Sequence, residues 1–174
     1  MLKNRLIPNI ILNNGSVVQS INFKHTNVIG NAITAVDFFN SWVVDEIIVL
    51  DVSRTDENRE MFHKIIRGLS KRCFVPLTVG GWIKNLNDIR QLLNEGADKI
   101  SINTEAVKNP KLIKTSSNTF GSQCIVVSID VKKNKNNVYE VHIDRGRKNT
   151  SIDPVEWSKE VESLGAGEIL LTSI

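Results

Sequence analysis

The chain has 174 residues, of which 41% are hydrophobic and 24% charged, as is typical of a folded globular domain rather than a disordered one. Its net charge of +3 is spread along the sequence and only 6% of its residues are aromatic, which argues against nucleic-acid binding. No stretch approaches the ~18 apolar residues of a membrane span, and the first residues, which include Arg5 and Pro8, do not resemble a signal peptide. We therefore expect a cytoplasmic protein that contacts neither nucleic acid nor membrane.

Six short apolar runs alternate with longer amphipathic segments. In chain order, the expected strands are Leu6–Leu12, Glu46–Asp51, Phe74–Val79, Lys99–Asn103, Cys124–Asp130 and Glu168–Ser173. The expected helices are Ala32–Trp42, Glu57–Ser70, Asn87–Asn94, Pro110–Thr119 and Pro154–Leu164, the last with Asp153 as N-cap. Near-continuous apolar strands indicate a parallel sheet covered on both faces by crossover helices.

An internal repeat supports this α/β architecture. Asp45-Glu46, Asp98-Lys99 and Gly167-Glu168 each follow a helix and open a strand with a charge, at spacings of 53 and 69 residues. Two βα units per repeat fit these spacings, if a polar hairpin around residues 132–144 is included, and favour a duplicated β/α barrel. The alternative is an open doubly wound sheet, but no glycine fingerprint follows the first strand.

Six strands do not close an eight-stranded barrel, which usually needs ~250 residues. We therefore expect residues 1–174 to be a single incomplete domain that lacks units 7 and 8, as a fragment, a truncated product or a form completed by another chain. Cys73 and Cys124 are isolated and each opens a hydrophobic run, which is typical of reduced core thiols and not of a metal site. We expect neither a metal nor a cofactor.

Polar residues follow the strands at the end where β/α barrels carry their chemistry. Asp51 and Asp130 close two apolar runs, where burial could raise the pKa of either carboxyl for acid–base catalysis; capping the following loop is the equally plausible alternative. Gly80-Gly81 forms a tight turn whose amides suit a phosphate, and Asn103-Thr104 offers polar groups for the same anion.

Four charged residues stand at strand starts. Alternation along a strand places Arg5, Glu46, Lys99 and Glu168 on the inward face, where two cations and two anions can form a neutral ring. Exposure on the rim is the simpler alternative for any one of them, but it does not explain their shared parity.

Several blocks closely resemble the cyclase subunit of imidazole glycerol phosphate synthase. They are Arg5 to Pro8, Asp45-Glu46, Leu50-Asp51, Pro76 to Gly81, Gly96 to Lys99, Ser101 to Asn103, Phe120 to Cys124 and Gly165 to Ile174. The resemblance implies a (β/α)8 TIM barrel, a glutaminase partner on the barrel floor, and ammonia that passes through a charged gate. The gate positions match Arg5, Glu46, Lys99 and Glu168, and Asp98 and Gln123 match floor positions that face the glutaminase.

The resemblance also implies roles at the opposite end of the strands. Asp130 matches one of two catalytic acids, and the phosphorylated substrate would be held by the residues around the glycine turn and the fourth strand. These substrate-binding positions are Asp51, Gly80, Gly81, Trp82, Asn103 and Thr104.

Three positions depart from that pattern. Ile11 replaces the second catalytic acid, Gln19 replaces a loop lysine, and Trp82 replaces the third glycine of the phosphate turn. Isoleucine cannot transfer a proton, and loss of an acid or base typically costs ~10²–10⁴ in rate. The pattern resembles a branch of the family that is associated with surface-polysaccharide synthesis and converts an acetamido sugar to an acetamidino sugar.

We therefore expect a synthase subunit that transfers ammonia to a small phosphorylated or sugar-linked acceptor. The alternatives are an ordinary cyclase of histidine biosynthesis and a non-catalytic remnant that only binds a glutaminase. A single-chain phosphosugar isomerase on the same barrel ranks last, because it would make no use of the charged ring.

Overall fold

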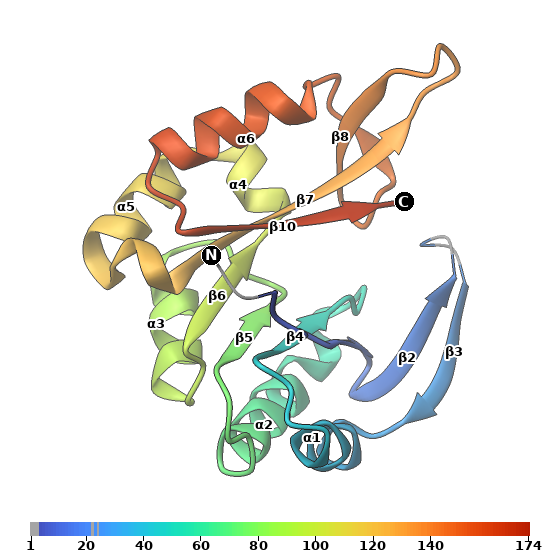
Figure 1. Cartoon of the computed structure of the whole chain (residues 1–174), viewed down its shortest axis with the longest axis vertical. Coiled ribbons are helices and arrows are strands. Elements are labelled where there is room, and N and C mark those ends of the chain that lie inside the picture. Colours follow the sequence, from blue (N-terminus) through green and yellow to red (C-terminus); the bar gives the residue numbers. More distant parts are fainter. Residues whose placement is uncertain (1–3, 22, 24) are drawn as a thin grey trace. The chain divides into compact units, whose positions relative to one another are not determined.

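The computed structural model describes residues 4–21, 23 and 25–174 (Figure 1). They form two compact units, which are described in turn. The first unit extends to Trp82 and includes Arg90–Ile100, and the second comprises Ile83–Ile89 and Ser101–Ile174. Helix α3 (Leu86–Asn94) and strand β6 (Lys99–Ile102) each contribute residues to both units.

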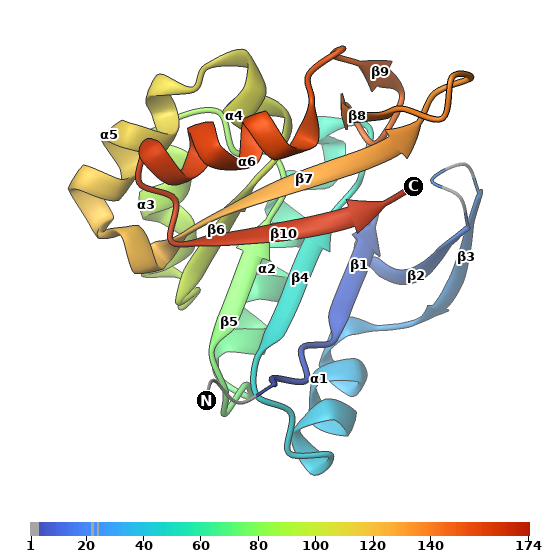
Figure 2. The same ribbon diagram turned by 45° about the horizontal axis from the view of Figure 1, so that its top comes forward.

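The first unit is built on a sheet with the order β3-β2-β1-β4-β5. Its strands are β1 (Asn9–Asn13), β2 (Ser16–Ile21), β3 (His25–Gly30), β4 (Ile47–Asp51) and β5 (Leu77–Gly80). β1, β4 and β5 are parallel and lie side by side, whereas β2 and β3 form an antiparallel hairpin that continues from β1 (Figure 2). The helices are α1 (Ala32–Ser41) and α2 (Arg59–Ser70), preceded by the short turn η1 (Asp56–Asn58).

The two faces of this sheet differ in the kind of side chain that they carry. Alternate residues on one face, including Leu12, Val49 and Val79, are at most 1% exposed. α1 packs against β1 and α2, and the buried side chains of α2 include Phe62 and Ile66. The opposite face carries Glu46 before β4, Ile11 in β1 and Thr78 in β5. The face away from the helices therefore carries the candidate functional groups.

The second unit has a sheet with the order β10-β7-β8-β9. Its elements are α4 (Thr104–Lys108), α5 (Lys111–Phe120), η2 (Ser122–Cys124), β7 (Ile125–Lys133), β8 (Tyr139–Ile143), β9 (Lys148–Asn149), α6 (Pro154–Ser163) and β10 (Glu168–Ser173). β10 runs parallel to β7, while β7, β8 and β9 are antiparallel. Asp153 caps α6 as predicted, because its Oδ1 accepts the N–H groups of Val155 and Glu156 at 2.8 and 3.0 Å.

The predicted α/β class, with parallel strands and alternating βα units, is confirmed, but several boundaries were wrong. β1 begins at Asn9 rather than Leu6, and β5 begins at Leu77 rather than Phe74, in each case just after a proline, which has no N–H to donate. Cys73 and Cys124 do not open strands: Cys73 lies before β5 and Cys124 lies in η2. Both are free and partly exposed, so they are not core residues.

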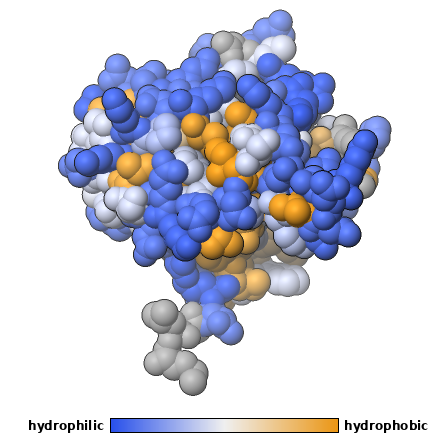
Figure 3. Space-filling view, turned by 90° about the horizontal axis from the view of Figure 1, so that it is seen from above, coloured by the Kyte–Doolittle hydropathy of each residue, from blue (hydrophilic) through white to orange (hydrophobic). Residues whose placement is uncertain are grey.

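The sequence prediction also missed β2, β3 and α4. Among the residues that the structure describes, no helix has the length and apolar character required to cross a bilayer. The face seen in Figure 3 is largely hydrophilic, with apolar side chains in separate patches.

Candidate functional site

A buried ion network occupies the strand starts of the first unit. Glu46 is 1% exposed, and its Oε2 lies 2.8 Å from Nζ of Lys99 and 3.2 Å from a guanidinium nitrogen of Arg5. Its Oε1 accepts the hydroxyl of Thr78 at 2.5 Å. We call these four residues the Glu46 cluster. Three of the four charges predicted to form a ring are therefore in direct contact.

Two aspartates hold the strands that carry this cluster. Asp45 Oδ2 accepts the N–H of Leu6, and Asp98 Oδ2 accepts the N–H of Leu77, both at 2.8 Å. The backbone returns each contact, from Asp45 to Leu6 at 3.0 Å and from Asp98 to Leu77 at 2.9 Å. This reciprocal contact fixes the register just before each strand start. The next residue, Glu46 or Lys99, then points to the face of the sheet away from the helices, which we call the inner face.

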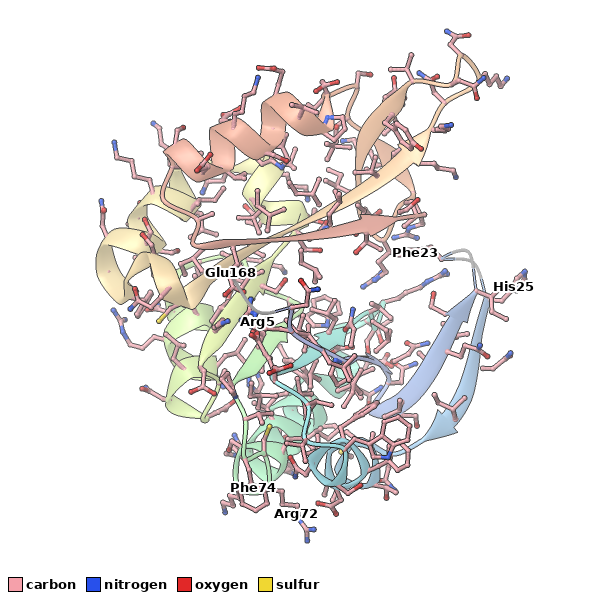
Figure 4. All side chains as sticks on the ribbon, in the orientation of Figure 1. Arg5, Phe23, His25, Arg72, Phe74 and Glu168 are labelled. Atoms are coloured by element: carbon pink, nitrogen blue, oxygen red, sulfur yellow. The ribbon has the colours of Figure 1, made fainter. Side chains whose placement is uncertain are left out.

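The third copy of the repeat lies in the second unit. Gly167 donates its N–H to Ile125, but a Cβ at this position would collide with the carbonyl oxygen of Ser122, so a glycine replaces the aspartate. Glu168 follows as the first residue of β10, where Figure 4 labels it, and is partly buried. It lies on the same face of its sheet as Asp130, since Glu168 pairs with Val126 and Thr172 with Asp130.

The strand ends of the first unit form a tightly bonded turn. Asp51 Oδ1 accepts the N–H and hydroxyl of Ser53 at 2.8 and 2.5 Å, and Asp51 Oδ2 accepts the indole N–H of Trp82 at 3.1 Å. A Cβ on Gly81 would lie 2.8 Å from the carbonyl oxygen of Asp51, and the φ of Gly81 is +120°. Gly80 is buried beside it in β5. Asp51 therefore caps the following loop, the alternative that the sequence had left open.

All three departures from the family pattern lie in the first unit. Trp82 has a φ of 61°, a left-handed conformation that is normal for glycine and strained for tryptophan. Ile11 is in register with Leu50, and Leu50 with Gly80, so the isoleucine side chain stands on the inner face where an acid was expected. Gln19 is exposed on β2 and pairs with Asn27. The strand end of β1 thus offers no group that can transfer a proton.

Asp130 is the buried acidic group of the second unit. It lies within β7, which continues to Lys133, so the sequence prediction that the strand ends at Asp130 was wrong. Its residue is 6% exposed, and this burial raises the pKa of its carboxyl to about 6, although hydrogen bonding from Asn103 acts in the opposite direction. A carboxyl with this pKa exchanges its proton close to neutral pH, as acid–base catalysis requires.

Asn103 and Thr104 connect Asp130 to the neighbouring loop. Asn103 Nδ2 donates to the carbonyl oxygen of Ser128 at 3.1 Å, and Thr104 Oγ1 accepts the N–H of Asp144 at 3.0 Å. The loop after β8 also contacts His142, whose Nδ1 lies 3.1 Å from the carbonyl oxygen of Gly146. His142 is directly opposite Asp130 in the β7–β8 pair, and our sequence reading missed it. Following the alternation of side chains from Asp130 through the polar hairpin would have placed His142 on the same face as Asp130.

The two residues predicted to face a partner are both exposed. Asp98 lies before β6 in the first unit, with one oxygen bonded to Leu77, and Gln123 lies in η2 of the second unit. Three apolar side chains at strand starts of the first unit are also exposed: Leu6 at 60%, Val43 at 86% and Phe74 at 86%. Arg5 and Phe74 are labelled in Figure 4.

Comparisons with known proteins place this geometry in context. A family model described as "Histidine biosynthesis protein" matches residues 5–174. The imidazole glycerol phosphate synthase subunit HisF of a Clostridium botulinum strain is 47% identical over 175 residues, covering 100% of this chain and 69% of the relative. A putative imidazole glycerol phosphate synthase subunit hisF2 of Vibrio vulnificus is 51% identical over 174 residues, and the chain spans 64% of its length. The HisF subunit of Lactococcus lactis is 46% identical, with 68% of its length covered.

Proposed function

The chain belongs to the histidine biosynthesis protein family, and from this premise we propose that it is a HisF-like synthase subunit. It receives ammonia from a glutaminase partner and transfers it to a small phosphorylated or sugar-linked acceptor at the strand ends. The observation that carries the proposal is the Glu46 cluster, a carboxylate at 1% exposure that binds two cations and a hydroxyl.

The cluster has the properties of a gate for a neutral molecule. Separating a buried ion pair leaves an uncompensated charge, which is costly. While Glu46 stays bound to Lys99 and Arg5, the cluster therefore blocks water and ions. Ammonia carries no charge and needs only a transient displacement of the Lys99 or Arg5 side chain. Arg5 is the mobile candidate, because its side chain is 45% exposed whereas that of Lys99 is 14% exposed.

The inner face supplies a route away from the cluster. In the first unit, Ile48, Leu50 and Ile11 follow Glu46 on the same face, and four residues of strand span roughly 13 Å. Apolar side chains favour neutral ammonia over ammonium. In the second unit, the buried hydroxyl of Ser101 has no hydrogen-bond partner among the described residues, and it follows Lys99 by two positions in β6. It could accept from or donate to ammonia in transit.

The glutaminase would dock against the strand starts. In the first unit, the exposed Leu6, Val43 and Phe74 surround the approach to the strands, and Asp98 offers a charge. In the second unit, Gln123 offers an amide on η2. Apolar anchors beside polar groups are typical of a protein–protein interface.

In the first unit, the residues proposed to bind the acceptor are Asp51, Gly80, Gly81 and Trp82. In the second unit they are Asn103 and Thr104, with Asp130 as the catalytic acid. Two acceptors are possible under this proposal. The precursor of imidazole glycerol phosphate is favoured by the names of the relatives. A nucleotide- or lipid-linked acetamido sugar is favoured by Ile11, which stands in place of one catalytic acid, and by Gln19. Trp82 also favours it, because its indole N–H donates to Asp51 at the turn. A remnant that only binds a glutaminase is the non-catalytic alternative.

The test supplies the chain with ¹⁵N-ammonium and each acceptor in turn. Mass spectrometry then follows ¹⁵N into imidazole glycerol phosphate or into an acetamidino sugar. Label in either product supports ammonia transfer and identifies the acceptor. Label in neither product, with a folded chain that still binds a glutaminase, supports the non-catalytic alternative.

A further inference from the structure

We propose that His142 is a second proton-transfer group that works with Asp130 on the acceptor, a role that rests on the ammonia transfer proposed above. The first observation is the strand register. Asp130 in β7 pairs with His142 in β8 and with Thr172 in β10, and His142 pairs with Asn149 in β9. Directly paired residues point to the same face, so the four side chains form one row.

The second observation is how the imidazole is held. Its Nδ1 lies 3.1 Å from the carbonyl oxygen of Gly146, and since a carbonyl can only accept, Nδ1 carries the hydrogen. The neutral ring then has its basic lone pair on Nε2. The contact with Gly146 therefore anchors one nitrogen of His142, and the other nitrogen remains the proton acceptor. The side chain is partly exposed.

The loop that holds His142 is itself constrained. Asp144, Arg145 and Gly146 have φ values of 55°, 56° and 73°, a run of three left-handed residues. Arg147 binds the Asp144 carboxylate at 2.8 and 2.9 Å, and the N–H of Asp144 donates to Thr104. Strain of this kind persists only where the surroundings enforce it, and here it joins the His142 anchor to the predicted substrate residue Thr104.

The other charged side chains on this face are Lys132 of β7, Glu140 of β8 and Glu168 of β10. Lys132 and Glu140 pair with each other two residues beyond Asp130 and His142, whereas Glu168 stands four residues before Thr172. Glu140 also accepts the side-chain amide of Asn149 at 2.6 Å, and Lys132 is exposed. β10 contributes the neutral Thr172 at this level. Asp130 and His142 are thus the only acid–base pair in the row that β10, β7, β8 and β9 form.

The chemistry needs no further reactant. Ammonia adds to a carbonyl carbon of the acceptor, an N–C bond forms, and the C=O π electrons move to the oxygen. Asp130, in its protonated form, gives that oxygen a proton. The new ammonium nitrogen gives a proton to Nε2 of His142. The imidazolium then returns that proton to the hydroxyl group, which leaves as water, while the Asp130 carboxylate takes an N–H proton and a C=N bond forms, so atoms and charge balance. Both a ketose phosphate and an acetamido sugar offer such a carbonyl.

A test of the pairing does not depend on activity. His142→Asn places an amide N–H where Nδ1 was, so it retains the donor to Gly146 but removes Nε2. Carbon-13 NMR of labelled aspartate follows the titration of Asp130 in the unaltered and substituted chains. We expect His142→Asn to shift the pKa of Asp130 by about half a unit or more, because the imidazole that stands opposite the carboxyl is replaced by a smaller amide. His25→Asn, on the exposed β3 of the other unit, should leave the titration unchanged. An identical titration of Asp130 in the His142→Asn chain overturns the proposal.

The second arm measures ammonium-dependent turnover. We expect His142→Asn to lower it by about 10²-fold with an unchanged melting temperature, while His25→Asn has no effect. Full turnover in folded His142→Asn also overturns the proposal. If the unaltered chain transfers no ammonia at all, the proposed function fails, whereas the NMR titration still decides whether the two side chains act as a pair.

Discussion

Nζ of Lys99 lies 2.8 Å from Oε2 of Glu46, although the two residues are 53 positions apart in the chain. Each is the first residue after an aspartate that accepts the N–H of a neighbouring strand segment. The duplicated Asp-plus-charge motif therefore brings an anion and a cation into contact from two repeats. This contact is the structural basis of the proposed ammonia gate.

Glu46→Gln should destabilise the protein. The substitution removes the buried anion that Lys99 and Arg5 contact, at a cost of about 3 kcal/mol in the free energy of unfolding. Urea denaturation followed by circular dichroism measures this cost. Glu156→Gln is the control, since its pair with Lys159 on α6 is exposed to solvent and should contribute little to stability. Equal effects of the two substitutions would show that the Glu46 cluster is not a buried network.

Gly81→Ala should also destabilise the chain, for a steric reason. Its φ of +120° is unfavourable for alanine, and the new Cβ would lie 2.8 Å from the carbonyl oxygen and 2.9 Å from the Cβ of Asp51. We expect a loss of about 2 kcal/mol or more, measured by the same denaturation. Gly30→Ala provides the contrast, because nothing lies within 4 Å of a Cβ there. A tolerated alanine at position 81 would mean that the turn is not held as described.

Asp130→Asn should stabilise the protein in a pH-dependent way. Burial raises the pKa of Asp130 from 3.8 to about 6, so the folded state binds a proton more tightly than the unfolded state. The stability from this group is present below pH 3.8 and is lost as the pH rises to about 6, by up to roughly 3 kcal/mol.

The side chain of asparagine does not ionise in this pH range. Asp130→Asn should therefore raise the melting temperature at pH values above about 6 and change it little below pH 3.8. Thermal melts across the pH range measure the difference. A parallel shift at every pH would contradict the assigned titration.

Ile11→Asp tests the consequence of the missing acid. The substitution places a carboxyl on the inner face, in register with Leu50, and should raise formation of imidazole glycerol phosphate from ammonium by about 10²-fold. Ile11→Asn is the matched control, since it has a similar shape and polarity but cannot transfer a proton. Product from the unaltered chain at the rate of Ile11→Asp would show that Ile11 does not limit this reaction.

The sequence predicted the parallel strands well because their apolar runs are long and clearly bounded. The contact between Glu46 and Lys99 followed from parity, since side chains alternate along a strand. Arg5 lies before β1, which begins at Asn9, so alternation along a strand does not account for its contact with Glu46. Asp130 was found for a similar reason, as a lone acid at the end of a buried run.

Other features carried weaker patterns. The β2–β3 hairpin was missed because every residue of β3 is exposed, so no alternation of apolar and polar residues marks it. The role of Asp51 was undecided, since only the structure reveals that Ser53 and Trp82 occupy its carboxylate oxygens. His142 was overlooked because its importance comes from its cross-strand partner and not from its neighbours in sequence.

The most direct test of the gate compares two ammonia sources in the complex of this chain with a glutaminase subunit. In Lys99→Ala, glutamine-dependent turnover should change much more than turnover with added ammonium, because ammonium can enter at the strand ends without crossing the Glu46 cluster. Lys159→Ala, on the exposed face of α6, should change neither. Equal changes in both reactions of Lys99→Ala would contradict the gate.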